Sequence, residues 1–400
     1  MSLLDASLYF TAALIAGALL EPLASRYRLP LNLMLMLAGF LASEALVHLG
    51  IDTGLRWYNF HDLVFYLLIP FLIFDTASRL NRAALLREWR VIALMAGPVL
   101  LAAAGLTAVL IYYAVGHPAG FPLSAALLAA ALLVGTDPGE VIAIAGVDLR
   151  YQRSTVLLEG ESVFSDVLAV TLFAVFLDDA LMGVKHIDFL TAGRIFLWSA
   201  AGGIAVGLIA GGLGWVVVRV VAAGTARALA AAAIAFGAFI VCQYFIAGSG
   251  AIAVLIATLM TVSHPGWGNE TERATVHVLG WSARVVLFVI AGATVTTFMF
   301  RDQWLAMLIA VAAASLARVV AVNSGLSGMN ILSRGDEFSL GERSQITVGG
   351  VKGAIVLALA LSLPLEFEAW YTVQSMVYGV VIFTLVAHPL IARALIRRIP

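Results

Sequence analysis

The residues best suited to chemistry in this sequence lie inside a long apolar segment, Ser154–Leu177. Asp166 is at its midpoint, about 12 residues or roughly 18 Å from the segment end at 1.5 Å per helical residue. An aspartate at the centre of a transmembrane helix costs roughly 2.5–3.5 kcal/mol, so a retained one indicates a function. Ser162 lies one helical turn before Asp166 and Ser165 is adjacent, which places two hydroxyl groups near the carboxylate. This combination predicts a site where Asp166 binds either a proton or a cation.

A second candidate group interrupts the apolar segment Pro122–Val147, where Thr136 and Asp137 precede Pro138. Asp137 has the position of a helix N-cap followed by proline at the first helical position. The same break frees backbone carbonyls, and these together with the Thr136 hydroxyl are hard oxygen ligands for a small cation. We therefore predict that Asp137 and Thr136 join Asp166 in a monovalent-cation site.

Two more charged residues lie within apolar segments, and their roles stay open at the level of sequence. Asp75 either contributes to the cation and proton site or forms an ion pair with Arg79, four residues further along the chain. Arg284 lies near the middle of its segment, and the sequence assigns it no partner.

Other charges have a structural interpretation. Glu161 and Arg318 are expected at the same depth in the membrane, so we predict a structural ion pair, since a carboxylate neutralised by arginine is a poor ion ligand. Lys352 lies in a second interruption, at residues 349–353. Half-helices that meet inside a membrane direct like dipole ends at each other, and Asp137 at one break with Lys352 at the other would offset them.

The composition defines the class of protein to which these residues belong. Apolar residues make up 62% of the 400 residues and charged residues 12%, which excludes a soluble enzyme, a nucleic-acid-binding protein and a disordered scaffold. The single cysteine, Cys242, excludes a disulfide framework and a thiolate metal cluster. A phosphate-binding loop is absent from the sequence, so we expect neither ATP nor a cofactor. We expect one transmembrane domain over 1–400, without a soluble regulatory domain and with the first apolar run retained.

The sequence contains thirteen apolar segments that we count as spans, although the weak break at residues 247–249 leaves open that two of them are one. They are Ala6–Leu23, Leu31–His48, Phe60–Ser78, Trp89–Val115, Pro122–Val147, Ser154–Leu177, Thr191–Val218, Ala228–Ile246, Gly250–Val262, Ala274–Phe298, Trp304–Asn323, Ser344–Pro364 and Ala369–Ile396. The fifth and the twelfth contain the two interruptions. This spacing predicts an all-α polytopic membrane protein built as a 6+1+6 inverted repeat, with repeat one over about 1–182, a linker helix over about 190–220 and repeat two over about 225–400.

The distribution of basic residues predicts the orientation. Most of the 23 lysine and arginine residues flank the spans on one side, and the other side has only Arg56, Lys185, Arg194 and Arg301. By the positive-inside rule, the N-terminus is outside and the C-terminus is cytoplasmic in an inner or plasma membrane.

With these residues placed, the sequence resembles the cation/proton antiporters of the NhaP and eukaryotic sodium/proton exchanger type. The stretches that carry the resemblance are Gly135-Thr136-Asp137-Pro138, Leu157–Asp166, Pro70–Asp75, Ala317-Arg318 and Gly349–Leu361. The resemblance implies an NhaA-like fold in which a dimerisation domain accompanies a six-helix core crossed by two broken helices. It also implies a homodimer, elevator-like alternating access, and Asp166 as the residue that exchanges a cation for protons.

We expect a secondary antiporter that exchanges Na⁺ for H⁺, one for one and without net charge movement, because Ser165 cannot ionise. The chain departs from the family at Ser165, where asparagine is usual, at Asp75, where glutamate is usual, and at Lys352, where arginine is usual. Exchange of K⁺ or Li⁺ is therefore an alternative. A cation channel, which would use the same acids, is a second one. An intramembrane serine hydrolase at Ser162 is disfavoured because no histidine base is well placed. The expected partners are the transported cation, the proton and membrane lipid, with no nucleic acid.

Overall fold

The structure is a computed structural model that describes residues 3–27, 29–50, 60–115, 120–139, 141–142, 152–181, 188–332 and 338–398. Arg56, Lys185 and the predicted second half-helix of the fifth apolar segment, from residue 143 onward, lie outside these ranges. The described residues form helices joined by turns and short extended connections, with no β-strand among them. A helix pairs its backbone groups internally, which is what a segment surrounded by hydrocarbon requires.

Helices occupy every one of the thirteen predicted apolar segments. Their bounds are α1 (Leu3–Tyr27), α2 (Leu31–His48), α3 (His61–Leu63), η2 (Val64–Leu68), α4 (Ile69–Ser78), α5 (Arg82–Leu94), η3 (Met95–Val99), α6 (Leu100–Ala114), α7 (Leu123–Leu132), α9 (Gln152–Leu181), α10 (Phe189–Val220), α11 (Thr225–Ile240), η5 (Val241–Phe245), α12 (Gly250–Val262), α13 (Glu270–Thr294), α14 (Thr297–Asp302), α15 (Trp304–Leu332), α16 (Leu340–Val348), α17 (Ala354–Leu361) and α18 (Trp370–Arg398). Ten of the described stretches are long and apolar enough to cross a bilayer, and α7 and α12 are shorter apolar helices. The count of thirteen spans and the repeat arrangement stay predictions.

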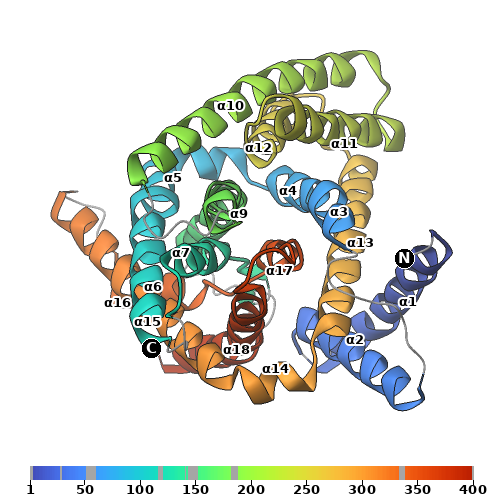
Figure 1. Ribbon diagram of the computed structural model, residues 1–400. Coiled ribbons are helices and arrows are strands. Elements are labelled where there is room, and N and C mark those ends of the chain that lie inside the picture. Colours follow the sequence, from blue (N-terminus) through green and yellow to red (C-terminus); the bar gives the residue numbers. More distant parts are fainter. Residues whose placement is uncertain are drawn as a thin grey trace.

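The helices form two groups that lie side by side (Figure 1). The core bundle contains α5, α6, α7, α9 and α15 to α18. The scaffold group contains α1 to α4 and α10 to α13, which surround the core bundle on two sides. Helices α9 and α17 are core helices that contact the scaffold, α9 through α4, α10 and α12, and α17 through α4 and α13. The broken segments α7 and α16–α17 therefore belong to the same group.

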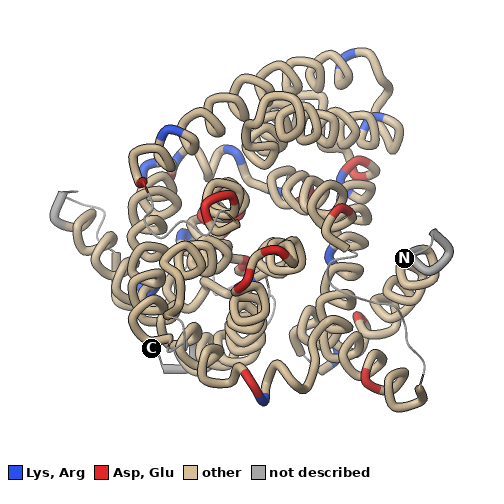
Figure 2. Tube along the Cα trace, viewed as in Figure 1, with Lys and Arg blue, Asp and Glu red and all other residues tan. Residues whose placement is uncertain are grey.

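Charged residues are sparse, and several of them lie in the interior of the bundle (Figure 2). Arg227 in the first turn of α11 is buried and donates hydrogen bonds to Glu272, to the Val218 carbonyl at 3.0 Å and to the Gly266 carbonyl at 2.7 Å. This one guanidinium links the end of α10, the start of α11 and the start of α13. The Val218 carbonyl lies in the last turn of α10, where carbonyls need donors from outside the helix.

Close packing of α10 against α12 depends on a row of glycines four residues apart. Gly203, Gly207 and Gly211 face α12, and a methyl group added at Gly207 would lie 2.8 Å from Cβ of Ile256 and 2.9 Å from the Ala253 carbonyl oxygen. Gly212, on the same helix, faces open space. Small residues at such positions let the two helix backbones approach closely, and the resulting van der Waals contacts contribute to helix association in a membrane.

The glycine row generates a prediction about stability. Gly207→Ala should destabilise the protein by about 1–3 kcal/mol because the added methyl overpacks the α10–α12 contact. Gly212→Ala is the matched control and should be neutral or slightly stabilising, since alanine is the better helix former by roughly 1 kcal/mol. Thermal unfolding of both purified variants in the same detergent measures the difference, and equal Tm values would contradict the packing interpretation.

Candidate functional site

The two breaks in the core bundle touch each other. Helix α7 ends at Leu132, a turn follows at residues 133–134, and residues 135–137 have no regular secondary structure. The second break lies between the end of α16 at Val348 and the start of α17 at Ala354. The Asp137 backbone N–H donates to the Val351 carbonyl at 2.7 Å. A methyl group at Gly353 would overlap with Cβ of Asp137. The contact between the two breaks therefore requires glycine at position 353.

Asp137 also begins the next half of its own segment. Its Oδ1 accepts a hydrogen bond from the Gly139 backbone N–H at 3.0 Å, with Pro138 between the two residues. This is the N-cap arrangement expected from the sequence, since proline at the first position has no N–H to satisfy. One carboxylate oxygen of Asp137 is thus engaged in capping, and the side chain lines a cavity described below.

Helix α9 holds the Thr136 part of the break with two serines. The Ser162 hydroxyl donates to the Thr136 carbonyl at 2.6 Å, and the Ser165 hydroxyl donates to the Ser162 carbonyl at 2.9 Å. Ser165 Oγ also accepts from the Thr136 N–H at 3.2 Å and lies 3.0 Å from the Thr136 hydroxyl. Because the single Ser165 proton is donated to Ser162, the Thr136 hydroxyl must be the donor in that last contact.

The three hydroxyl groups differ in the number of lone pairs that remain free to bind a ligand. Ser165 Oγ donates once and accepts twice, so its hydrogen-bonding capacity is filled and its role is to hold the break. Ser162 and Thr136 each donate their proton to a protein acceptor, which leaves lone pairs on both oxygens available to a cation. The carbonyl of Thr136 accepts the Ser162 hydroxyl with one of its two lone pairs.

The Asp166 carboxylate lies against the first break. Its side chain is 8% exposed, and a methyl group at Gly135 would lie 2.9 Å from its Oδ1. No residue in the described ranges donates a hydrogen bond to this carboxylate. The charged groups that act on it electrostatically are Asp137, Lys352 and Arg284.

Asp166 differs in this respect from the other buried acids. Within the described residues five acidic side chains are buried, and four of them contact an arginine: Asp75 with Arg79, Glu88 with Arg153, Glu161 with Arg318, and Glu272 with Arg227. Asp166 is the fifth. Isolating one carboxylate from arginine while pairing the rest leaves Asp166 as the buried acid that can take up an exogenous cation or a proton.

Glu161 and Arg318 form the contact expected from their depth. Arg318 donates to both Glu161 carboxylate oxygens, at 2.7 and 3.1 Å. It also donates to the carbonyls of Ile346 at 3.0 Å and Thr347 at 3.2 Å, which are in the last turn of α16. A methyl group at Gly350 would overlap with the guanidinium. The pair thus connects α9, α15 and the end of α16 beside the second break.

Lys352 is buried in the second break, as the sequence indicates. Its backbone N–H donates to the Thr384 hydroxyl on α18 at 3.1 Å, and its side chain and that of Arg318 line the same small cavity. The charges that act on Lys352 include Asp166 and Glu161. Compensation of the helix dipoles by Lys352 stays a prediction.

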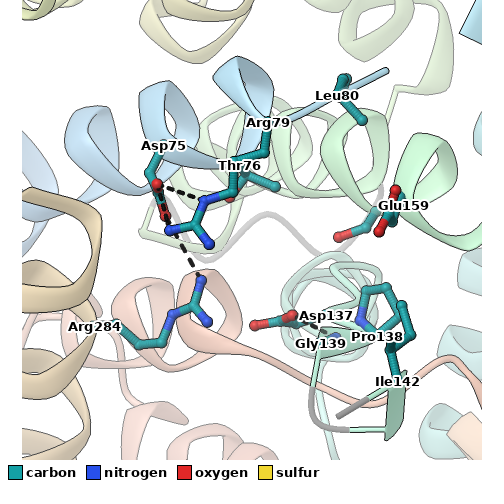
Figure 3. Close-up of a pocket in the computed structure, with 11 residues that line it drawn as sticks. Asp75, Thr76, Arg79, Leu80, Asp137, Pro138, Gly139, Ile142, Glu159 and Arg284 are labelled. Carbon is teal, nitrogen blue, oxygen red and sulfur yellow. Dashed lines mark hydrogen bonds and ion pairs between the residues drawn. The ribbon is translucent and has the colours of Figure 1, made fainter. Parts of the chain in front are cut away.

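A cavity of about 190 Å³ lies beside the first break (Figure 3). The scaffold contributes Asp75, Thr76, Arg79, Leu80 and Arg284, and the core bundle contributes Asp137, Pro138, Gly139, Ile142, Glu159 and Ser162. The sequence-predicted residues Asp137 and Ser162 are therefore accessible to water-sized molecules. The Asp75 carboxylate is held by Arg79, at 2.7 Å for each of two hydrogen bonds, which is the ion pair that the spacing offered.

The position of Arg284 is a feature that sequence reasoning missed. Its Nη2 lies 3.9 Å from Asp75 Oδ2, across the contact between α13 and α4. The sequence does contain one signal, since Gly280 lies one turn before Arg284 and a methyl group there would overlap with the Asp75 carboxylate. A glycine and an arginine four residues apart thus form the pocket for this acid.

Comparison with known proteins fits this fold. Residues 10–398 match the family described as "Sodium/hydrogen exchanger, transmembrane". The Na(+)/H(+) antiporter NhaH of Halobacillus aidingensis is 29% identical over 289 residues, covering 70% of this chain and 69% of that protein. The Na(+)/H(+) antiporter NhaG of Bacillus atrophaeus is 25% identical over 408 residues, covering 98% and 74%. The structure of the sodium proton antiporter MjNhaP1 from Methanocaldococcus jannaschii at pH 8 matches with a TM-score of 0.80 and 19% identity, covering 98% of this chain and 100% of that one.

The family match and the apolar helices define an integral membrane transporter, and the structural match gives its fold. The chain belongs to the transmembrane sodium/hydrogen exchanger family, and the resemblance predicted from its motifs is confirmed.

The Glu161–Arg318 contact generates a prediction about stability. Glu161→Gln or Arg318→Gln leaves one buried charge without its partner and should destabilise the protein by about 3–5 kcal/mol, while the double variant should lose much less than the sum. Thermal unfolding in detergent of the two single variants and the double variant measures this coupling. Strictly additive losses would show that the two side chains do not stabilise each other.

Proposed function

We propose that this protein is a secondary active antiporter that exchanges a monovalent cation, Na⁺ in the first instance, for H⁺. The observation that carries the proposal is that Asp166 is the buried acid without an arginine partner in the described residues, and that it lies at the break between two half-helices. Relatives of the chain that are named Na⁺/H⁺ antiporters support the choice of ions.

In the proposed mechanism Asp166 has two alternative loads. In the first state the Asp166 carboxyl is protonated and neutral. In the second state the proton has left to water, and the carboxylate binds a partly dehydrated cation together with the hydroxyl oxygens of Thr136 and Ser162. Asp137 and water complete this cation site. The available lone pairs on these two hydroxyls and the cavity that reaches Ser162 and Asp137 support this set of ligands. Ser165 acts by holding the break in place.

The loaded core bundle would carry the site across the membrane against the scaffold, as in an elevator. An unpaired carboxylate at the membrane midplane is costly, so the empty site does not cross, and this penalty couples cation movement to proton movement. The contact of both breaks within one helix group supports movement of that group as a unit. The proposal includes a homodimer joined through the scaffold, inverted repeats, and an N-terminus outside the cell membrane with a cytoplasmic C-terminus.

The central prediction concerns Asp166→Asn. An amide cannot exchange a proton for a cation, so cation-driven proton flux in proteoliposomes should fall to the level of empty liposomes while the protein stays folded. Asp302→Asn is the matched control, because Asp302 is half-exposed at the end of α14 and pairs with the neighbouring Arg301. Dequenching of a pH dye, scanned over Na⁺, K⁺, Li⁺ and Rb⁺, also decides which cation is carried. Substantial flux from Asp166→Asn would refute the assignment.

A second prediction concerns stoichiometry. Ser165 cannot ionise and Glu161 is neutralised by Arg318, so Asp166 alone exchanges its proton and transport should be one cation for one proton, insensitive to voltage. The test imposes a K⁺-valinomycin potential on proteoliposomes with a Na⁺ gradient, once K⁺ has been excluded as a substrate. A shift of the flux reversal point with voltage would show that a second group, such as Asp137 or Asp75, also carries a proton.

A further inference from the structure

Asp75 lies between two arginines at the wall of the cavity. Its carboxylate is 1% exposed and accepts two hydrogen bonds from Arg79 on its own helix, while Arg284 of α13 lies 3.9 Å from the same carboxylate. The sum of these three charges is positive. A carboxylate in this position is a poor ligand for a transported cation, because its charge is already exceeded by that of its neighbours.

Arg284 also faces the other side of the cavity. In Figure 3 its guanidinium lies between Asp75 and Asp137, and its charge acts on Asp166 as well. Arginine stays protonated at every relevant pH and its planar group matches a carboxylate, so Arg284 is a permanent cation attached to the protein beside the site. A cation that enters this cavity and Arg284 are drawn to the same carboxylates.

The residues that line this cavity belong to two different helix groups. Asp75 and Arg284 belong to scaffold helices α4 and α13, whereas Asp137 and Ser162 belong to the core bundle. If the guanidinium moved from Asp75 to Asp137, it would occupy a site carboxylate and would join the scaffold to the core bundle by an ion pair. Gly280, which gives the Asp75 carboxylate its room against α13, favours the pairing with Asp75.

We propose that Asp75 is a clamp that keeps Arg284 away from Asp137, and that Arg284 is a positioning residue whose charge sets the apparent affinity of the site for the transported cation. This inference rests on the proposed antiporter function and adds to it a determinant of affinity that lies outside the ligands. It also assigns Asp75 a role other than cation or proton binding.

The test compares four variants in proteoliposomes under the same Na⁺ gradients. Asp75→Asn releases the guanidinium to Asp137, and exchange should fall at least tenfold. The double variant Asp75→Asn/Arg284→Gln has no guanidinium to release, and exchange should recover to at least half of the wild-type rate. Arg284→Gln alone should lower the apparent KM for Na⁺ several-fold with little change in maximal rate, and Arg284→Lys, which keeps the charge, should leave KM close to the wild-type value.

Several results would overturn the clamp. If Asp75 were a cation ligand, the double variant would be as inactive as Asp75→Asn, and if it had no role, Asp75→Asn would retain full exchange. An unchanged or raised KM for Arg284→Gln refutes the affinity role and does not depend on the folding of the Asp75 variants. Failure of the proposed function itself gives a different pattern, in which wild-type protein and Asp166→Asn both show only the flux of empty liposomes.

Discussion

The structure depends on how the backbone groups that two broken helices release inside the membrane are satisfied. Each unpaired buried N–H or C=O costs about 1–3 kcal/mol, and no water is available in hydrocarbon to replace the missing partner. Two of these groups find a partner within their own break, since the Gly139 N–H donates to Asp137 and the Val351 N–H donates to the Gly349 carbonyl. The other partners come from other elements: Val351 O for the Asp137 N–H, Ser165 and Ser162 for Thr136, Thr384 for the Lys352 N–H, and Arg318 for the carbonyls of Ile346 and Thr347. The breaks therefore determine which side chains α9, α15 and α18 must present.

The same requirement explains how most polar side chains around the breaks are used. Two serines on α9 are used for holding the backbone, and the guanidinium of Arg318 neutralises Glu161 while it caps α16. What remains in the described residues is one buried carboxylate, Asp166, that has no arginine and no hydrogen-bond donor of its own. A carboxylate in that condition is unstable as an empty anion, and a small cation or a proton relieves it.

Features that depend on position along one helix could be predicted from the sequence. Depth in a membrane follows from residue number, which is why the contact of Glu161 with Arg318 could be expected, and why both breaks could be located from their glycines and from Pro138. The motif resemblance gave the family, which the comparison confirms. Lateral neighbours could not be predicted in this way. The approach of Arg284 to Asp75 joins helices that are more than 200 residues apart in the chain, and hydropathy carries no information on which faces meet.

The hydrogen-bond partners of individual polar side chains could not be predicted from the sequence either. Ser162, Ser165 and Thr136 are all hydroxyl residues near Asp166, and their order along the chain does not reveal which one is saturated. Arg227 is a similar case, because its place in the first turn of α11 suggests an exposed basic residue, whereas it is buried against Glu272. Side-chain partners of this kind are set by tertiary packing.

The contact of Arg318 with Glu161 and with the last turn of α16 has a consequence for how the chain can vary. The guanidinium needs a bidentate acceptor at 161 and an absent side chain at 350, and lysine at 318 could not reach the carboxylate and two carbonyls together. Positions 161, 318 and 350 are distant in the chain but constrained as a unit. Among related sequences they should change together or not at all, so their covariation would record this single contact.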